Sequence, residues 1–317
     1  MSGSGRIVYH LTRSSGPSGG IKVMLEHVEA LRAAGLDAVC YVKSDDQRPT
    51  AFETTAPILT GAIGITPSDV VVRPETLVAA AIDAAARGGL RQAVFVQNHY
   101  YCRHSLGNAR CYDDLGVELV FCASHRIKRF LEDNAIAKDV PVVPCAVTLP
   151  DTGLIAKQER IAVMPRKRPF ELEVIQHLLS LKKPELSGIP WSTIEDHSHC
   201  DALRVLADSS VFLCLQRFEG FGLPALEAMA AGCLVSGFLG DSASDYATAE
   251  NGSWVPDDDL EAASNALVSD LQLLRENPIG VRQRIRAGRR TAARYDVKTR
   301  NTALFDVVRR LGFSVDM

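Results

Sequence analysis

Apolar residues follow two different patterns along this chain, and the two patterns alternate. Short runs rich in β-branched residues fit buried strands, whereas longer segments with an apolar residue every three or four positions fit amphipathic helices. The clearest helix is expected over residues 20–34, and Gly35 provides its stop signal. This alternation predicts parallel sheets with helical crossovers, and therefore an α/β fold.

The pattern also divides the chain into two parts. Residues 144–160 are rich in turn formers and contain no long periodic segment, so a domain boundary is expected there. We place a first Rossmann-like domain over residues 1–148 and a second over residues 149–317, each of roughly 150 residues. Strands are expected at 6–10, 38–42, 70–72, 93–96, 117–122, 140–143, 161–164, 211–215 and 234–238. Further helices are expected at 170–181, 200–207, 224–231, 260–274, 281–293 and 298–311.

Composition and charge narrow the class of protein. Hydrophobic residues make up 46% and charged residues 23%, which is ordinary for a globular chain. The net charge of −3, with both signs interspersed, argues against a nucleic-acid partner. The eight cysteines are scattered without a C-x-x-C pair, which fits a reducing compartment. With no apolar leader and no window of about eighteen apolar residues, a cytoplasmic location is expected.

The most informative segment is QRFEGFGLPALEAMAAG, residues 216–232. It follows an apolar strand, turns through two glycines and enters a helix near Pro224. In open α/β sheets, ligands bind beside the carboxyl ends of the strands. Free backbone amides at a helix start, together with the helix dipole, favour an anion such as a diphosphate. The segment therefore predicts a phosphate-binding turn.

Two carboxylates accompany this turn. Glu219 lies in the loop, and Glu227 lies one turn inside the helix. Carboxylates accept hydrogen bonds from hydroxyl groups, so Glu219 can hold sugar hydroxyls and Glu227 can hold a ribose diol. The alternative interpretation is an ordinary strand–turn–helix junction with two solvated glutamates.

The segment resembles the signature of the retaining GT-B glycosyltransferases of the family 4 type (glycosyl transferases group 1), EGFGLP-x-x-E-A-M-A-x-G, with seven residues between the glutamates. The resemblance implies a GT-B fold, in which two Rossmann-like domains with parallel sheets face a central cleft and the last helix crosses back to the first domain. It also implies that Glu219 contacts the transferred sugar near its reacting carbon, while Glu227 holds the nucleotide ribose. The backbone amides that would contact sugar and phosphates are those of Gly220, Phe221, Gly222 and Leu223.

Three consecutive basic residues, Arg166, Lys167 and Arg168, follow the first strand of the second domain. Cations at a strand end can neutralise a diphosphate leaving group. In the similar family an arginine and a lysine of this region take the place of a metal ion, although they are spread over a longer loop. We assign this role to Arg166 and Lys167, with a solvated basic turn as the alternative.

Two further candidates lie in the first domain. Gly19 and Gly20 precede the first helix, where the similar family has a Gly-Gly pair that reaches the donor phosphate, and their spacing matches neither a dinucleotide loop nor a P-loop. His99 follows a strand, and the resemblance implies that it contacts the donor sugar. A purely structural turn and a structural histidine are the alternatives.

The resemblance implies a nucleoside-diphosphate sugar as donor substrate, without a cofactor or a metal ion, and a glycan, a lipid-linked molecule or a small molecule as acceptor. His197, His199 and Cys200 lack the spacing of a metal site. A group of arginines allows peripheral contact with anionic lipid at the inner face of the membrane, with a solvated helix face as the alternative. These are Arg282, Arg284, Arg286, Arg289, Arg290 and Arg294. The residues indicate no oligomeric state.

These features together predict a hexosyltransferase-like enzyme that moves a sugar to an acceptor hydroxyl, in polysaccharide or glycoconjugate biosynthesis. Retention of configuration is implied by the resemblance alone. Two alternatives stay open. One is a non-catalytic nucleotide-sugar-binding partner of another transferase. The other is a different GT-B enzyme, such as a sugar-nucleotide epimerase or a phosphorylase.

Overall fold

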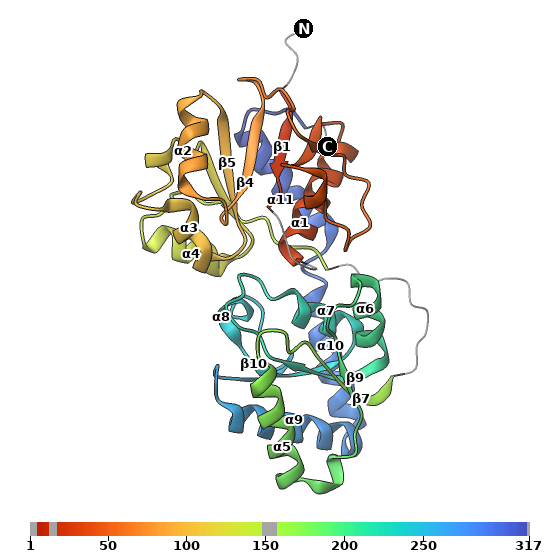
Figure 1. Cartoon of the computed structure of the whole chain (residues 1–317). Coiled ribbons are helices and arrows are strands. Elements are labelled where there is room, and N and C mark those ends of the chain that lie inside the picture. Colours follow the sequence, from red (N-terminus) through yellow and green to blue (C-terminus); the bar gives the residue numbers. More distant parts are fainter. Residues whose placement is uncertain (1–4, 13–17, 148–156, 316–317) are drawn as a thin grey trace. The chain divides into compact units, whose positions relative to one another are not determined.

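The structure is a computed structural model, and it describes residues 5–12, 18–147 and 157–315. The chain forms two compact units (Figure 1), of which the first comprises Met1–Ala146 and Lys298–Met317 and the second comprises Val147–Val297. The domain boundary expected between residues 148 and 149 lies outside the described residues. The central cleft expected between the two domains stays a prediction.

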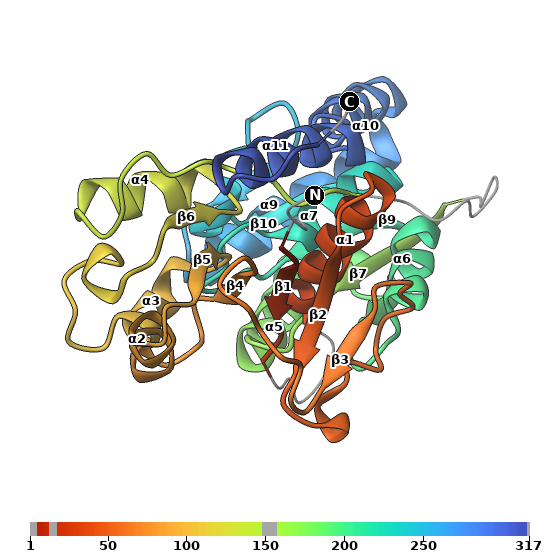
Figure 2. The ribbon, with the colours of Figure 1, turned by 90° about the horizontal axis from the view of Figure 1, so that it is seen from above.

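The first unit is built on a six-stranded parallel sheet of order β3-β2-β1-β4-β5-β6. Figure 2 shows its strands β2, β1 and β4 next to one another. The strands are β1 (Ile7–His10), β2 (Ala38–Val42), β3 (Ile58–Thr60), β4 (Val70–Pro74), β5 (Arg91–Val96) and β6 (Leu119–Cys122). The helices are α1 (Gly19–Ala33), α2 (Ala79–Arg87), α3 (Cys102–Leu106), α4 (His125–Asp133), α11 (Val297–Arg310) and the 3-10 turns η1 (Asp45–Gln47), η2 (His99–Tyr101) and η3 (Asp113–Leu115).

The second unit is built on a five-stranded parallel sheet of order β11-β10-β9-β7-β8. Its strands are β7 (Gln158–Val163), β8 (Trp191–Thr193), β9 (Ser209–Cys214), β10 (Leu234–Phe238) and β11 (Ser253–Val255). Its helices are α5 (Pro169–Lys182), α6 (His199–Asp208), α7 (Leu223–Ala231), α8 (Gly240–Ala243), α9 (Leu260–Glu276), α10 (Pro278–Ala292) and the 3-10 turn η4 (Pro184–Leu186). Because every strand pair is parallel, the strands' carboxyl ends meet at one edge of the sheet.

The α/β alternation predicted from the sequence is confirmed, and so are most of its elements. Helix α1 starts one residue earlier than expected and ends where Gly35 adopts a φ of +82°, with the Leu36 amide donating to the Leu31 carbonyl oxygen. This is the glycine stop that the sequence predicts.

Strand prediction failed at three of the four edge strands of the two described sheets and succeeded at β6. Strands β3, β8 and β11 have three residues each, are partly exposed and were not expected, because so short a run shows no clear alternation. The strand expected at residues 140–143 is wrong, since this segment makes only a single bridge, between Cys122 and Val142. Its prolines at 141 and 144 cannot donate to a sheet.

Helix α11 belongs to the first unit although it follows the second in sequence, and Figure 1 shows it in blue among red elements. Leu304, Val307 and Val308 are buried on it. Arg300 donates from Nη1 to Oε2 of Glu26 on α1 at 2.7 Å. Among the described residues, no helix combines the length and the apolar character needed to cross a membrane.

Candidate functional site

Strand β9 leads into helix α7 through a turn that only glycine accommodates without strain. Gly222 is the N-cap residue and has a φ of +81°, a left-handed conformation that a side chain disfavours. Pro224 follows within the first helical turn, where its missing N–H leaves no hydrogen bond unmade. The helix starts at the carboxyl end of β9, as the sequence predicts.

Buried aromatic and amide groups hold this turn in place. The hydroxyl of Tyr246 donates to the carbonyl oxygen of Gly222 at 2.9 Å, and Nε2 of Gln216 donates to the same oxygen at 3.4 Å. Phe221 is buried, and its ring lies 5.3 Å from that of Tyr295, centre to centre, in an edge-on contact. The turn is therefore fixed before any ligand arrives.

Phe218 marks a strained point in the same loop. Its φ is +50°, a region that bulky residues rarely adopt, yet its side chain is 53% exposed and contributes little packing in return. The guanidinium of Arg217 lies 5.3 Å from the centre of its ring. Strain of this kind concentrates at functional sites, so the loop is a candidate for ligand contact on grounds other than its sequence.

Glu219 meets a cation from a neighbouring strand. Nζ of Lys167, in the loop after β7, lies 2.5 Å from Oε1 of Glu219 and donates to the carbonyl oxygen of Arg217 at 3.1 Å. The side chains of Lys167 and Glu219 are about one-third exposed, at 31% and 34%. A ligand can therefore reach both charges, and neither is committed to the core.

The three consecutive basic residues have separate environments. Arg166 is exposed, whereas the side chain of Arg168 is only 2% exposed. Arg168 forms ion pairs with Glu171 and Asp258, and its guanidinium lies 4.6 Å from the centre of the Phe238 ring. Arg168 therefore stabilises the loop after β7, which leaves Arg166 and Lys167 as the candidates for binding an anion.

Glu227 has a histidine as its partner. Its side chain is 8% exposed, and its Oε1 lies 2.9 Å from Nε2 of His199. His199 is the first residue of α6, which follows β8, and α6 packs against α7. A buried carboxylate needs a polar partner, and His199 supplies it.

One edge of the second sheet thus gathers the candidates of this unit. Lys167 follows β7, His199 follows β8, and Glu219 and Glu227 follow β9. These three strands are neighbours in the order β9-β7-β8 and run parallel. Among the described residues, no three histidine, cysteine, aspartate or glutamate side chains are grouped as ligands for a metal ion.

The first unit brings its own candidates together at the corresponding edge of its sheet. Gly19 and Gly20 begin α1, and Nε2 of Gln97, after β5, donates to the Gly20 carbonyl oxygen at 3.1 Å. A Cβ atom on Gly20 would lie 3.1 Å from that Nε2 atom, so the close approach favours glycine. Gln97 in turn donates its backbone N–H to Oε2 of Glu75 at 3.2 Å. Burial raises the pKa of the Glu75 carboxyl to about 7.

His99 is the first residue of the 3-10 turn η2, which Asn98 caps, and it is buried. Its ring is 2% exposed and lies 4.2 Å from the ring of Tyr100 and 4.6 Å from that of Phe130, centre to centre. The contacts expected between the donor and Gly19, Gly20 and His99 stay predictions.

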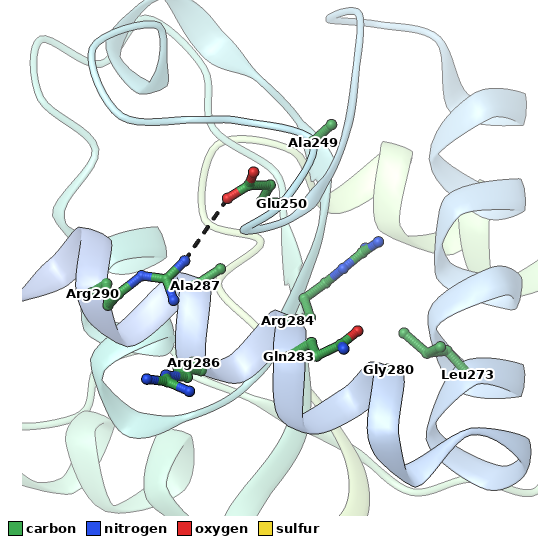
Figure 3. A pocket seen from close by; sticks show the side chains of 9 residues that line it. All are labelled: Ala249, Glu250, Leu273, Gly280, Gln283, Arg284, Arg286, Ala287 and Arg290. Carbon is green, nitrogen blue, oxygen red and sulfur yellow. Dashed lines mark ion pairs between the residues drawn. The ribbon is translucent and has the colours of Figure 1, made fainter.

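The arginine-rich segment lies elsewhere in the second unit. Helix α10, residues 249–250 and Leu273 of α9 line a hollow of about 470 Å³, where Figure 3 shows Arg290 directed toward Glu250. Nη2 of Arg290 lies 3.8 Å from Oε2 of Glu250. Residues 249–250 precede β11, so the hollow lies at the amino ends of the strands, away from the candidate site. Arg284 pairs with the buried Asp270 at 3.1 Å and supports the core. A lipid contact of the exposed arginines stays a prediction.

Comparison with known structures identifies the fold. The two parallel sheets with their helices match the GT-B fold, and the structural neighbours of this chain are GT-B glycosyltransferases. Among them, the pneumococcal O-GlcNAc transferase GtfA, solved with UDP and GlcNAc, has a TM-score of 0.71 and 12% identity over 98% of this chain and 100% of that one. HepE from Anabaena, solved with UDP and glucose, has a TM-score of 0.72 and 13% identity over 96% and 99%.

A sequence relative also carries the name of a glycosyltransferase. An alpha-1,6-glucosyltransferase of Actinobacillus pleuropneumoniae serotype 7 (strain AP76) is 26% identical over 233 residues, which is 70% of this chain and 69% of that protein. No protein-family model matches the sequence.

Sequence reasoning missed two side chains at these sheet edges. His199 was weighed as a metal ligand, whereas its ring contacts Glu227, a residue 28 positions away. The sequence did not indicate a role for Glu75, because an isolated glutamate after a strand matches no functional motif. The role of His199 depends on the packing of α6 on α7. The role of Glu75 depends on the end of β4 lying beside the turn after β5.

Proposed function

We propose that this protein transfers a sugar from a nucleoside-diphosphate sugar to the hydroxyl group of an acceptor. One observation carries the proposal. The beginning of α7 lies at the carboxyl end of β9, with the Lys167–Glu219 pair on its loop and the His199–Glu227 pair on its second turn. This arrangement supplies donors for a diphosphate and acceptors for two sets of hydroxyl groups, which are the polar parts of a nucleotide sugar.

Each group has a distinct task in the proposed reaction. The amides of Gly220 to Leu223 and the dipole of α7 bind the diphosphate. Lys167 and Arg166 stabilise the negative charge that grows on it as the glycosidic bond breaks, which replaces the charge of a metal ion. Glu219 orients the transferred sugar, and Glu227 holds the ribose. The departing phosphate accepts the proton of the acceptor hydroxyl, and the configuration at the reacting carbon is retained.

The comparisons support UDP as the nucleotide. GtfA and HepE were solved with UDP, HepE also with UDP-glucose, and the sequence relative is named a glucosyltransferase. We therefore propose a UDP-linked hexose as donor, with UDP-glucose as the first to test. The acceptor is a glycan, a lipid-linked sugar or a small molecule.

The test measures UDP release from UDP-glucose, with and without candidate acceptor glycans and with excess EDTA. We expect acceptor-dependent release that EDTA leaves unchanged, and a product whose anomeric configuration by NMR equals that of the donor. Glu219→Gln and Lys167→Gln should each lower kcat by about 10²-fold or more, because the first weakens the orientation of the transferred sugar and the second removes positive charge that stabilises the leaving diphosphate. Glu173→Gln and Lys138→Gln, at exposed positions, are the matched controls.

Two outcomes would replace the proposal by its alternatives. Tight UDP binding without transfer to any acceptor, unchanged in Glu219→Gln, indicates a nucleotide-sugar-binding partner. Interconversion of the donor sugar without an acceptor indicates an epimerase.

A further inference from the structure

We propose that His199 is a positioning residue that holds Glu227 in the orientation needed to bind a ribose hydroxyl, so that the site selects ribonucleotides over 2′-deoxyribonucleotides. This inference rests on the proposed function, since it concerns the nucleotide of the same donor. It goes further by assigning a role to a side chain outside the 216–232 segment and by giving the site a selectivity.

The hydrogen bond between His199 and Glu227 has a defined direction. Nε2 of His199 lies 2.9 Å from Oε1 of Glu227, within ordinary hydrogen-bond distance. An ionised carboxylate can only accept, so Nε2 carries the proton when Glu227 is ionised. The bond occupies one oxygen of the carboxylate and defines its plane.

The other carboxylate oxygen of Glu227, Oε2, is the atom that would meet the ligand. Among the described residues, His199 is the one side chain that hydrogen-bonds to Glu227. The Glu227 side chain keeps 8% of its surface exposed, and that of His199 keeps 26%. Oε2 is therefore left to accept from a ligand hydroxyl, which would complete the hydrogen bonding of a nearly buried charge.

His199 and Glu227 are both held in rigid helices. His199 begins α6, where Oγ of Ser198 accepts from the backbone N–H of Asp201 at 3.1 Å and caps the helix. Glu227 lies within α7, and the two helices pack together. Both partners thus project from regular elements, so the carboxylate is oriented before the ligand binds and little side-chain entropy is lost on binding.

If the His199–Glu227 hydrogen bond only linked α6 to α7, its geometry would be the same. The effect of breaking it on stability and on ligand affinity would differ. Breaking such a link lowers stability and weakens all ligands alike. A positioning role instead affects the part of the ligand that Glu227 touches, which is the ribose. The loss of selectivity between UDP and 2′-deoxy-UDP therefore distinguishes the two.

The experiment compares the wild type with His199→Ala, His199→Gln, Glu227→Gln and the double variant His199→Ala/Glu227→Gln. Calorimetry gives the Kd of UDP and of 2′-deoxy-UDP, steady-state kinetics gives KM and kcat for UDP-glucose, and thermal unfolding reports stability. His177→Ala, at an exposed position on α5, is the matched control.

We expect the wild type to bind UDP at least ~10-fold more tightly than 2′-deoxy-UDP, as one hydrogen bond to a charged group implies. His199→Ala should remove most of this preference and raise KM by about the same factor, with little change in kcat. His199→Gln should restore most of the preference because its amide also donates. The double variant should be no worse than Glu227→Gln, since the histidine acts through the glutamate.

An unchanged preference in His199→Ala, or an equal weakening of both nucleotides, would overturn the inference and leave the proposed function intact. The proposed function fails in a different way, through a wild type that binds none of UDP, GDP and ADP.

Discussion

Burial separates Arg166 from Arg168 although the two residues have the same side chain and lie in the same loop. Arg168 is enclosed by Glu171, Asp258 and the Phe238 ring, whereas Arg166 is exposed. Residue type predicted the basic character of the loop correctly. It could not predict which cation is used for packing, because that depends on side chains up to 90 positions away.

A similar effect at Glu75 gives a prediction about pH. Burial raises the pKa of its carboxyl from 4.5 to about 7, so the folded protein holds this proton more strongly than the unfolded chain does. The stability that the protonated form provides is fully present below pH 4.5 and is lost as the pH rises through 7. Glu75→Gln should therefore reduce the loss of unfolding free energy between pH 5 and pH 8 by roughly 2–3 kcal/mol.

Urea unfolding at the two pH values measures this difference, with the exposed Glu53→Gln as control. The glutamine oxygen can still accept the Gln97 amide, so the folded turn is kept. An equal pH dependence in the wild type and Glu75→Gln would show that Glu75 titrates normally.

At the scale of elements, local sequence determines the turn between β9 and α7, and residues distant in the sequence hold it in place. Two glycines and a proline predicted the turn, and the structure has it. The sequence did not indicate that Tyr246 and Gln216 would hold the Gly222 carbonyl. It also did not indicate that His199 would meet Glu227, because that contact depends on how two helices pack.

The same reasoning explains which elements were predictable. The central strands β1, β5, β9 and β10 are buried and strongly apolar, so their composition alone identifies them. The edge strands β3, β8 and β11 are held by pairing with a neighbour rather than by burial. Strand pairing is made by backbone hydrogen bonds, so residue type indicates it only weakly.

Gly222 offers a test at this scale. With a φ of +81° at the N-cap of α7, Gly222→Ala should cost roughly 1–2 kcal/mol of stability, because a Cβ atom is disfavoured in that conformation. It should also weaken UDP binding, since the strain turns the first amides of α7. Gly188→Ala is the control, since Gly188 is exposed and has open space around its Cα. Equal thermal midpoints for the two variants would contradict this account.

At the scale of the whole molecule, the chain passes from the first unit to the second and back again. The last helix supplies buried side chains and the Arg300–Glu26 ion pair to a unit otherwise made from the first 146 residues. The length of the chain and its central turn-rich segment predicted two domains. That helix's attachment was expected only from the resemblance.

A destabilising substitution in α11 should therefore unfold elements that are far from it in the sequence. Val307 is fully buried, so Val307→Asp places an unpaired charge in the core of the first unit and should unfold that unit. Limited proteolysis with mass spectrometry should show cuts within residues 5–146, while residues 157–297 remain protected. Asp306→Asn, exposed on the same helix, should leave the cleavage pattern unchanged. Cuts confined to residues 157–297 would refute this division.

The order of synthesis gives α11 a further consequence. A ribosome completes the whole of the second unit before it makes the helix that the first unit needs. The nascent first unit must wait with an apolar face uncovered, at the stage when chains are most prone to aggregate. Folding of the first unit is thus completed by a helix made after the whole second unit, and the second unit is free to fold in the interval.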